Sequence, residues 1–227
     1  EAARILARVP EALFSPEDLE TFTKVFEELK LRYTSNLDRP ESHLSLGILA
    51  ENRNQPADAE KHYRKAVRRE STYVPARMNL ATLLSRRGQS KEAEEILREA
   101  AELQPTWGQV HYSLGLLLAE DRNRLPEAIR SLERASAYWR DNPRVFNNLA
   151  IAYWQSDKID DAISAFLQAI DLQPDNPEFT QNVVQLLVQR GRWRDALPHA
   201  RRMVQLLPVN LQVQALLPQI EENIKNE

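Results

Sequence analysis

Histidine is the residue type in this chain best suited to bind a metal ion or to transfer a proton. The four histidines are His43, His62, His111 and His199, and no Asp or Glu stands at a ligand spacing such as that of His-Glu-x-x-His. The chain has no Cys, which excludes disulfides, thiol nucleophiles and thiolate zinc sites. It also lacks a nucleophile paired with a base and a glycine-rich phosphate loop. We therefore expect no metal, no cofactor and no enzymatic activity.

Arginine is the second residue type with binding chemistry, and it is concentrated in two segments of the chain. The cationic residues of these segments are Arg64, Lys65, Arg68, Arg69, Arg190, Arg192, Arg194, Arg201 and Arg202. Elsewhere acids alternate with bases, as in Glu94 and Arg98, whose four-residue spacing suits an ion pair on a helix. The pattern indicates a solvated face rich in ion pairs. Docking of an anionic partner near Arg201 is a secondary alternative.

The composition is that of a chain that folds. Of the 227 residues, 42% are hydrophobic and 28% are charged. The net charge of −3 argues against nucleic acid as the main partner, and no apolar run is long enough for insertion into a membrane. The chain opens at Glu1 without a signal peptide. We interpret it as a fragment or processed segment of a longer protein, and its compartment, cytoplasm or periplasm, stays open.

A repeat of 34 residues must position these side chains. Alanine recurs at Ala59, Ala93, Ala128, Ala162 and Ala196, and again seven residues later at Ala66, Ala100, Ala135 and Ala169, with Met203 in the last copy. A fixed period of this size is typical of a solenoid, whose units bury their apolar faces by stacking. The predicted units are 40–73, 74–107, 108–142, 143–176 and 177–210, and the third has one extra residue.

Each unit is predicted to form two antiparallel helices of roughly 13 residues, because apolar residues recur at helical spacing in both halves. Four of the five glycines support this alignment. Gly47 and Gly115 stand at position 8 of their units, where they would let two helices approach closely. Gly88 and Gly191 stand at position 15, where a residue without Cβ most easily turns the chain between helices.

The two ends of the chain do not fit the repeat. Residues 1–39 are predicted to form a helical cap or the tail of a preceding helical domain, with a short helix over 1–9. A second helix should start with Ser15 as its N-cap and Pro16 as its first residue. Residues 211–227 are predicted to form a capping helix, with an apolar stripe on one side and a polar tail that keeps the array soluble.

The repeat resembles the tetratricopeptide repeat family over residues 40–210. The residues that carry the resemblance are the pairs Leu46-Gly47, Leu114-Gly115 and Leu149-Ala150, and then Tyr153, Ala162, Phe166, Ala169 and Pro174 in the fourth copy. The resemblance implies an all-α solenoid, a right-handed superhelix of helical hairpins. The fifth unit departs from the pattern, with Val183-Val184 for Leu-Gly and Met203 for Ala. We therefore expect looser packing there.

The resemblance also implies a concave groove lined by the first helix of each unit. The candidate groove residues are Leu44, Ser45, Met78, Asn79, Thr82, Tyr112, Ser113, Leu116, Asn147, Asn148, Ile151, Trp154, Gln181, Asn182 and Gln185. Position 6 is Asn in three units, and an Asn amide can donate to and accept from a peptide backbone at once. Asn is common at this position in the family, so the residue type alone does not establish a function. Trp154 and Tyr112 are the expected anchors.

Together these features favour a non-catalytic scaffold that binds an extended or helical peptide segment of a protein partner. The family's clamp for a terminal carboxylate is not expected, because the Lys it needs at position 5 and the Asn it needs at position 9 are both absent. One alternative is an accessory domain for docking or assembly in a larger periplasmic multihaem cytochrome or other enzyme, since the chain also resembles arrays that follow such domains. Self-association through the N-terminal helices is a further alternative.

Overall fold

The computed structural model describes Val9 and residues 13–226, and the regular elements in these residues are all helical. The helix predicted over residues 1–9 lies outside the described residues except for Val9. The chain divides into two compact units with the boundary between Pro105 and Thr106. They are called the N-terminal unit and the C-terminal unit.

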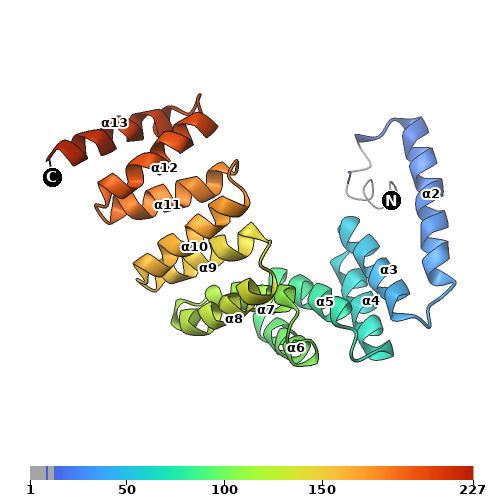
Figure 1. The fold of residues 1–227 in the computed structure, drawn as a ribbon. Helices are drawn as coiled ribbons and strands as arrows, with labels where there is room; N and C mark the ends of the chain where they lie inside the picture. The colour runs from blue at the N-terminus through green and yellow to red at the C-terminus, as the bar shows by residue number, and fades with distance from the viewer. Residues whose placement is uncertain (1–8, 10–12, 227) are drawn as a thin grey trace. The chain divides into compact units, whose positions relative to one another are not determined.

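The described part of the N-terminal unit is one long helix followed by two helical hairpins (Figure 1). Its helices are α2 (Pro16–Thr34), α3 (Pro40–Asn52), α4 (Pro56–Arg69), α5 (Val74–Arg86) and α6 (Ser90–Leu103). Within this unit, each of the helices α2 to α5 packs against the helix that follows it. The Ser15 hydroxyl accepts a hydrogen bond from the backbone N–H of Asp18 at 3.1 Å, which confirms the predicted N-cap of α2.

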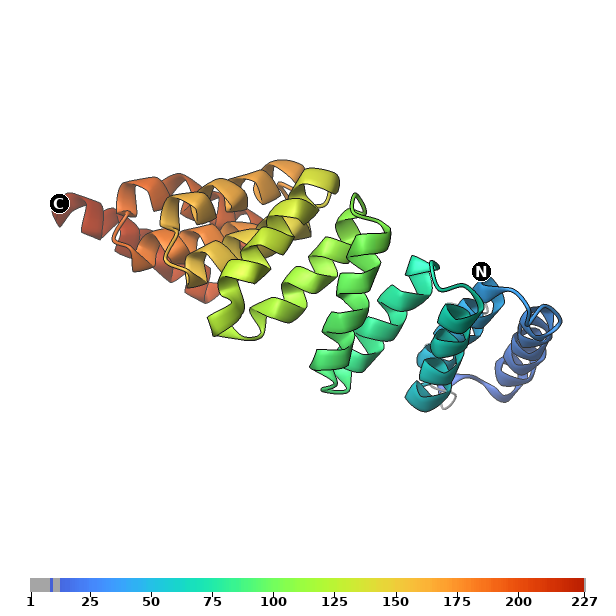
Figure 2. The same cartoon turned by 90° about the horizontal axis from the view of Figure 1, so that it is seen from below.

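The C-terminal unit contains three hairpins and a last helix, which stack side by side in chain order (Figure 2). Its helices are α7 (Gly108–Ala119), α8 (Leu125–Tyr138), α9 (Pro143–Gln155), α10 (Ile159–Leu172), α11 (Pro177–Gln189), α12 (Trp193–Leu206) and α13 (Leu211–Asn226). A short 3-10 helix, η2 (Arg122–Arg124), joins α7 to α8. The all-helical architecture of sequential hairpins is the one predicted from the repeat.

Small side chains set how closely the two helices of a hairpin approach. The alanines that recur on the second helix of each repeat are all fully buried: Ala59, Ala66, Ala93, Ala100, Ala128, Ala135, Ala162, Ala169 and Ala196. Glycine serves the same purpose on the facing helix. A Cβ atom added to Gly47 would overlap the ring of Tyr63, and one added to Gly115 would lie 2.7 Å from Leu132 Cγ. Tyr63 and Leu132 are themselves fully buried.

The core of the fifth repeat is as deeply buried as the cores of the others, but its two helices contact each other less than those of the other hairpins, in line with the looser packing expected there. Met203 is 2% exposed, and Val183 and Val184 are fully buried. The reason is an exchange of volume between two positions of α12. Met203 stands where the other repeats have Ala, while Ala200 stands where they have Tyr, Leu or Phe. A large-for-small exchange of this kind keeps the volume of the core nearly constant.

The turn inside most hairpins depends on one residue with a left-handed backbone. Gly88 and Gly191 have φ angles of 76° and 67°, as their placement in the repeat predicted. Asn54 and Asp157 occupy the same position in the first and fourth repeats, with φ angles of 56° and 60°. Asn and Asp tolerate this conformation better than other residues with a Cβ. In the third repeat, η2 occupies this connection instead.

Substitution of Gly47 by Ala is expected to destabilise the N-terminal unit by about 1–3 kcal/mol, because the added methyl group must displace the buried ring of Tyr63. Urea unfolding followed by circular dichroism measures the loss. The matched control is Gly88→Asn, since nothing lies within 4 Å of a Cβ at Gly88 and Asn54 already adopts this turn. A Gly47→Ala variant as stable as the wild type would contradict the close-approach account.

Candidate functional site

In the N-terminal unit, the predicted groove residues bond mainly to their own helix. Leu44, Ser45 and Met78 are half-buried. The Asn79 amide donates to the backbone carbonyl of Pro75 at 2.9 Å, and the Thr82 hydroxyl donates to the carbonyl of Met78 at 2.9 Å. The backbone of α5 therefore already uses some of their hydrogen-bond donors, which leaves fewer of them free for a ligand.

In the C-terminal unit, the predicted groove residues instead connect one repeat to the next. The Asn148 amide donates to the Tyr112 hydroxyl at 2.7 Å, which joins α9 to α7. The Asn182 amide donates to the Asn147 amide oxygen at 2.9 Å, which joins α11 to α9. Both bonds link residues about one repeat apart. We call these two bonds amide rungs, because they link the first helices of consecutive repeats. Each bond uses one N–H of an asparagine, Asn148 or Asn182, that was expected to face a ligand.

Asn147 differs from the other predicted groove residues because it is only 3% exposed. Its amide oxygen is paired with Asn182, so it stabilises the contact between α9 and α11 and is not available to a partner. Tyr112 is also largely structural. Its ring lies edge-on to Trp139 at 5.9 Å, and burial raises the pKa of the Tyr112 hydroxyl, against the smaller opposing effect of the hydrogen bond from Asn148.

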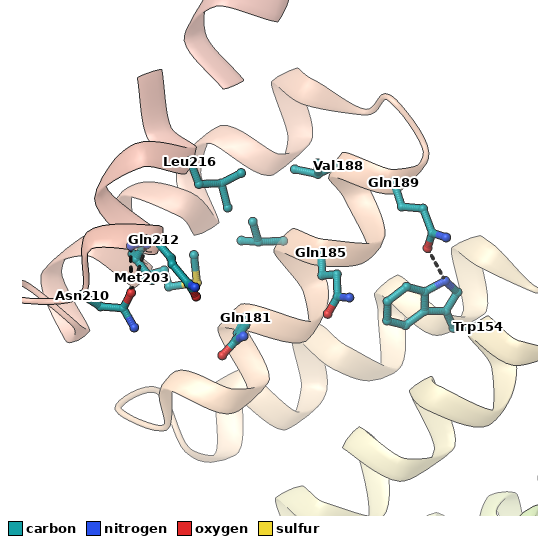
Figure 3. Close-up of a pocket in the computed structure, with 11 residues that line it drawn as sticks. Trp154, Gln181, Gln185, Val188, Gln189, Met203, Asn210, Gln212 and Leu216 are labelled. Carbon is teal, nitrogen blue, oxygen red and sulfur yellow. Dashed lines mark hydrogen bonds between the residues drawn. The ribbon is translucent and has the colours of Figure 1, made fainter. Parts of the chain in front are cut away.

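A cavity of about 630 Å³ opens between α9, α11, α12 and α13 of the C-terminal unit (Figure 3). Its lining consists of Trp154, Gln181, Val184, Gln185, Val188, Gln189, Met203, Asn210, Gln212, Val213 and Leu216. Three of the predicted groove residues, Trp154, Gln181 and Gln185, line it. The cavity is lined by apolar, indole and amide side chains only, so it carries no ionisable group.

The floor of the cavity is apolar and its rim is made of amides. Val184, Met203 and Val213 are buried. Gln181 and Gln185 lie along α11 in Figure 3, with Gln212 on α13. These three glutamine side chains are exposed, and no hydrogen bond to another described residue is present. Each of them therefore offers both an N–H donor and a carbonyl acceptor.

Trp154 closes one end of the cavity. Its indole N–H donates to the Gln189 amide oxygen at 3.1 Å, a contact drawn in Figure 3. Its ring also lies edge-on to Phe166, with centroids 6.4 Å apart. These two contacts fix the orientation of the indole. One broad face of a rigid aromatic ring is the kind of surface on which binding energy is often concentrated.

Asn210 closes the other end of the cavity by capping α13. Its side-chain oxygen accepts hydrogen bonds from the backbone N–H groups of Gln212 at 3.1 Å and Val213 at 3.2 Å. This cap fixes where α13 begins and so turns Gln212 and Leu216 toward the cavity. The last helix, predicted only as a solubilising cap, is thus a wall of the candidate site.

Met203, Gln212 and Leu216 line the cavity but are not among the predicted groove residues, although the repeat frame contains a signal for the last two. If the 34-residue frame is continued past Asn210, Gln212 falls at position 2 and Leu216 at position 6. Both are positions that the family resemblance assigns to the groove. The remaining predicted residues of the C-terminal unit do not line this cavity: Tyr112, Ser113, Leu116, Asn147, Asn148, Ile151 and Asn182.

The histidines belong to the packing of the hairpins. His43 and His111 are each 3% exposed, and the ring of His111 stacks on Tyr138 with centroids 6.1 Å apart. Burial lowers the pKa of His199, and Asp195 raises it by a smaller amount. Within residues 13–226, no three His, Asp or Glu side chains converge on a point where a metal ion could bind. In the same residues, no helix has the length and apolar character needed to cross a bilayer.

Two sequence profiles described as tetratricopeptide repeat match the chain, at residues 52–117 and 112–177. Together they span more than half of it. None of the curated proteins matches the chain. The matches to solved structures are more extensive, although they have low sequence identity.

One such structure is of PilF from Pseudomonas aeruginosa, with a TM-score of 0.68 and 23% identity over 82% of this chain and 86% of that one. A structure of MamA from Desulfovibrio magneticus RS-1 has a TM-score of 0.67 and 19% sequence identity, and the match covers 76% of this chain and 97% of that one. The structure of YrrB, described as a TPR protein with an unusual peptide-binding site, has a TM-score of 0.65 and 18% sequence identity. That match covers 86% of this chain and 96% of that one. Likeness at such identities supports the fold, an array of helical hairpins.

Substitution of Asn182 by Ala is expected to cost about 1–3 kcal/mol of stability, because the buried amide oxygen of Asn147 loses its hydrogen-bond donor. The free energy of unfolding in urea measures this loss. The neighbouring Gln181→Ala is the control, since its exposed amide has no partner in the described chain and its loss should change stability by no more than about 0.5 kcal/mol. Equal effects of the two substitutions would contradict the structural role of Asn182.

Proposed function

Since this chain belongs to the tetratricopeptide repeat family, whose members generally act as scaffolds for protein–protein interaction, we propose that it binds an uncharged, extended segment of a protein partner in the cavity between α9 and α13. The proposal rests mainly on one observation, the row of free glutamine amides beside an apolar floor. We propose no catalytic step, because the cavity lining has no nucleophile, acid or base.

The spacing of the amides suits an extended backbone. Gln181, Gln185 and Gln189 are four residues apart on α11, which places them about 6 Å apart along the helix axis. An extended peptide turns equivalent backbone groups to the same side every two residues, or about 6.6 Å. Gln189 uses its amide oxygen for Trp154 but keeps its N–H groups. The row can therefore bond to successive backbone groups of one bound strand.

An extended segment fits these amides better than a helical one. The backbone N–H and C=O groups of a helix are already paired within the helix, so they would leave the amides of Gln181 and Gln185 without partners. An extended segment has both groups free along its whole length. Of the two peptide conformations that the sequence left open, the extended one is therefore proposed.

The apolar floor supplies the anchor for a side chain of the bound segment. Val184, Met203 and Val213 form a buried base, with the edge of Leu216 above it. A Met at the base adapts its shape easily to different apolar groups. Alternate side chains of an extended segment point to opposite sides, so one apolar residue can reach the floor while its neighbours face solvent. This arrangement favours partners with an isolated Leu, Ile, Val or Met in an uncharged segment.

The name of YrrB supports peptide binding as a property found on this fold, since that protein is described as having an unusual peptide-binding site. That description applies to YrrB. For the present chain the support comes from the cavity itself, which has a volume of about 630 Å³, within the usual range for ligand sites.

The double substitution Gln181→Ala and Gln185→Ala is expected to weaken binding by at least about fivefold, because two contacts to the peptide backbone are lost at roughly 0.5–1.5 kcal/mol each. A peptide selected from a displayed library on the full chain is the probe, and calorimetry measures its affinity. Trp154→Ala should cause a loss of similar size.

The control for this experiment is Gln168→Ala with Gln173→Ala, which removes two exposed amides from α10 and its C-cap, outside the cavity. This control should bind the peptide as the wild type does. Selected peptides that bind equally well to the wild type and to the variant lacking Gln181 and Gln185 would overturn the proposed site.

Binding at this cavity is expected to be nearly independent of salt, with the dissociation constant changing by less than about twofold between 0.05 and 1 M NaCl. The lining carries no charge, so screening by salt has little to act on. Calorimetry at the two salt concentrations makes the comparison. A steep loss of affinity with salt would indicate that the peptide binds to a charged face of the chain instead.

A further inference from the structure

A second cavity, of about 440 Å³, lies between α3 and α4 of the N-terminal unit and has the opposite chemistry. It is lined by Leu37, His43, Lys65, Arg68 and Arg69. Four of these five residues carry a positive charge or can acquire one. The three permanent cations lie within one and a half turns at the end of α4, so they converge on the same space.

The three cations are not paired with acids in the part of the chain that the structure describes. Lys65, Arg68 and Arg69 have no ion pair or hydrogen bond there, whereas Arg64, directly before them, contacts both Glu60 and Glu92 at 2.8 Å. The next acid in the chain, Glu70, accepts a hydrogen bond from the neutral Thr72 hydroxyl and makes no ion pair with these cations. The lining of the cavity itself is therefore cationic, with no acid among its five residues.

The buried His43 forms one side of the cavity, and it is paired with the half-buried His62, which lies outside the cavity lining. His43 Nδ1 lies 3.2 Å from His62 Nδ1, so one of these nitrogens donates and the other accepts. His43 also makes a hydrogen bond to the backbone of Leu37. The tautomers of the two rings decide which of the two Nδ1 atoms donates.

Burial and the nearby cations lower the pKa values of this histidine pair. Burial lowers the pKa of His43 most, and Lys65, Arg69 and Arg68 lower it further, while the Leu37 hydrogen bond raises it. Burial also lowers the pKa of His62, followed by the effects of His43 and Lys65. The charged groups around the pair are Asp58, Lys61, Lys65, Arg68 and Arg69 on α4 and Lys30 on α2. Asp58 is the acid among these groups, while Glu70 directly follows Arg69 and Glu92, Glu95 and Glu99 line a neighbouring hollow with Arg68.

We propose that this cavity binds a phosphoryl group, either as free phosphate or on a phosphorylated residue of a partner. Two guanidinium groups can each hold two oxygens of a phosphoryl group in a fork, and the Lys65 ammonium supplies a point charge. The buried ring of His43 covers one side of the cavity, while Leu37, Arg68 and Arg69 are exposed to solvent, so a phosphoryl group can reach the three cations. The site lies in a different unit from the peptide cavity and does not depend on it.

The number of cations favours a phosphoryl group over a carboxylate. A phosphate monoester carries between 1.5 and 2 negative charges near neutral pH and has three strong acceptor oxygens, by the usual values for phosphoamino acids. A carboxylate carries one charge and two oxygens, and it would leave at least one of the three cations unpaired. A cluster of three cations at the end of one helix also differs from the long basic stripe that binds a nucleic-acid backbone.

The test is an NMR titration of the full chain with inorganic phosphate and, separately, with O-phosphoserine, observed at the imidazole signals of His43 and His62. Saturable shifts are expected. The pKa of the pair should rise in the presence of ligand, because a bound dianion opposes the effect of the cations. Arg68→Gln combined with Arg69→Gln should weaken binding by at least tenfold, and added NaCl should weaken it strongly.

The matched control is Arg201→Gln with Arg202→Gln. It removes the same charge from another pair of adjacent arginines, but these already contact Glu221 at 3.1 Å and Asp175 at 2.8 Å. Wild-type affinity in this control, with loss in the Arg68 and Arg69 variant, supports the site. Tighter binding of phosphoserine assigns a phosphorylated partner, and equal binding assigns free phosphate. Absence of saturable shifts in the wild type, or equal loss in both variants, would overturn the proposal whatever the peptide experiments give.

Discussion

The close approach of two helices within each hairpin is the constraint on which the rest of the structure depends. In the first four repeats, alanine stands at two positions of the second helix and glycine or alanine on the facing helix, and the space beside these small residues is filled by larger side chains such as Tyr63 and Leu132. The larger residues must then fit around that contact. The exchange of volume between Ala200 and Met203 shows that the constraint acts on total volume rather than on residue identity at one position.

Contacts between repeats are more varied than contacts within them. On the first helices of the C-terminal unit they are amide rungs, such as Asn182 to Asn147. At the turns they are ion pairs, such as Arg190 with Asp157 at 2.5 Å. Exposed ion pairs contribute at most about 1 kcal/mol each, while a buried amide that loses its partner costs more. The amide rungs therefore contribute more to the order of the stack, and for the same reason they are poor candidates for binding a partner.

The same repeat frame produces two cavities of different chemistry in the two units. In the C-terminal unit, Gln181 and Gln185 keep their amides free beside an apolar floor. In the N-terminal unit, Arg68 and Arg69 end α4 without acidic partners among the described residues, beside a buried histidine. Position in the repeat fixes which way each side chain points. The neighbouring repeat decides whether its hydrogen-bonding or charged group is already used.

The sequence alone determined the repeat, the helical hairpins, the glycine turns and the N-cap of α2, because each depends on residues close in the chain or on a strict period. It did not distinguish the engaged amide of Asn147 from the free amide of Gln185, nor show that α13 walls a cavity or that His43 meets His62. Those features depend on contacts between residues that are far apart in the chain. A helical period gives the direction of a side chain, but only the packed neighbours determine what it meets there.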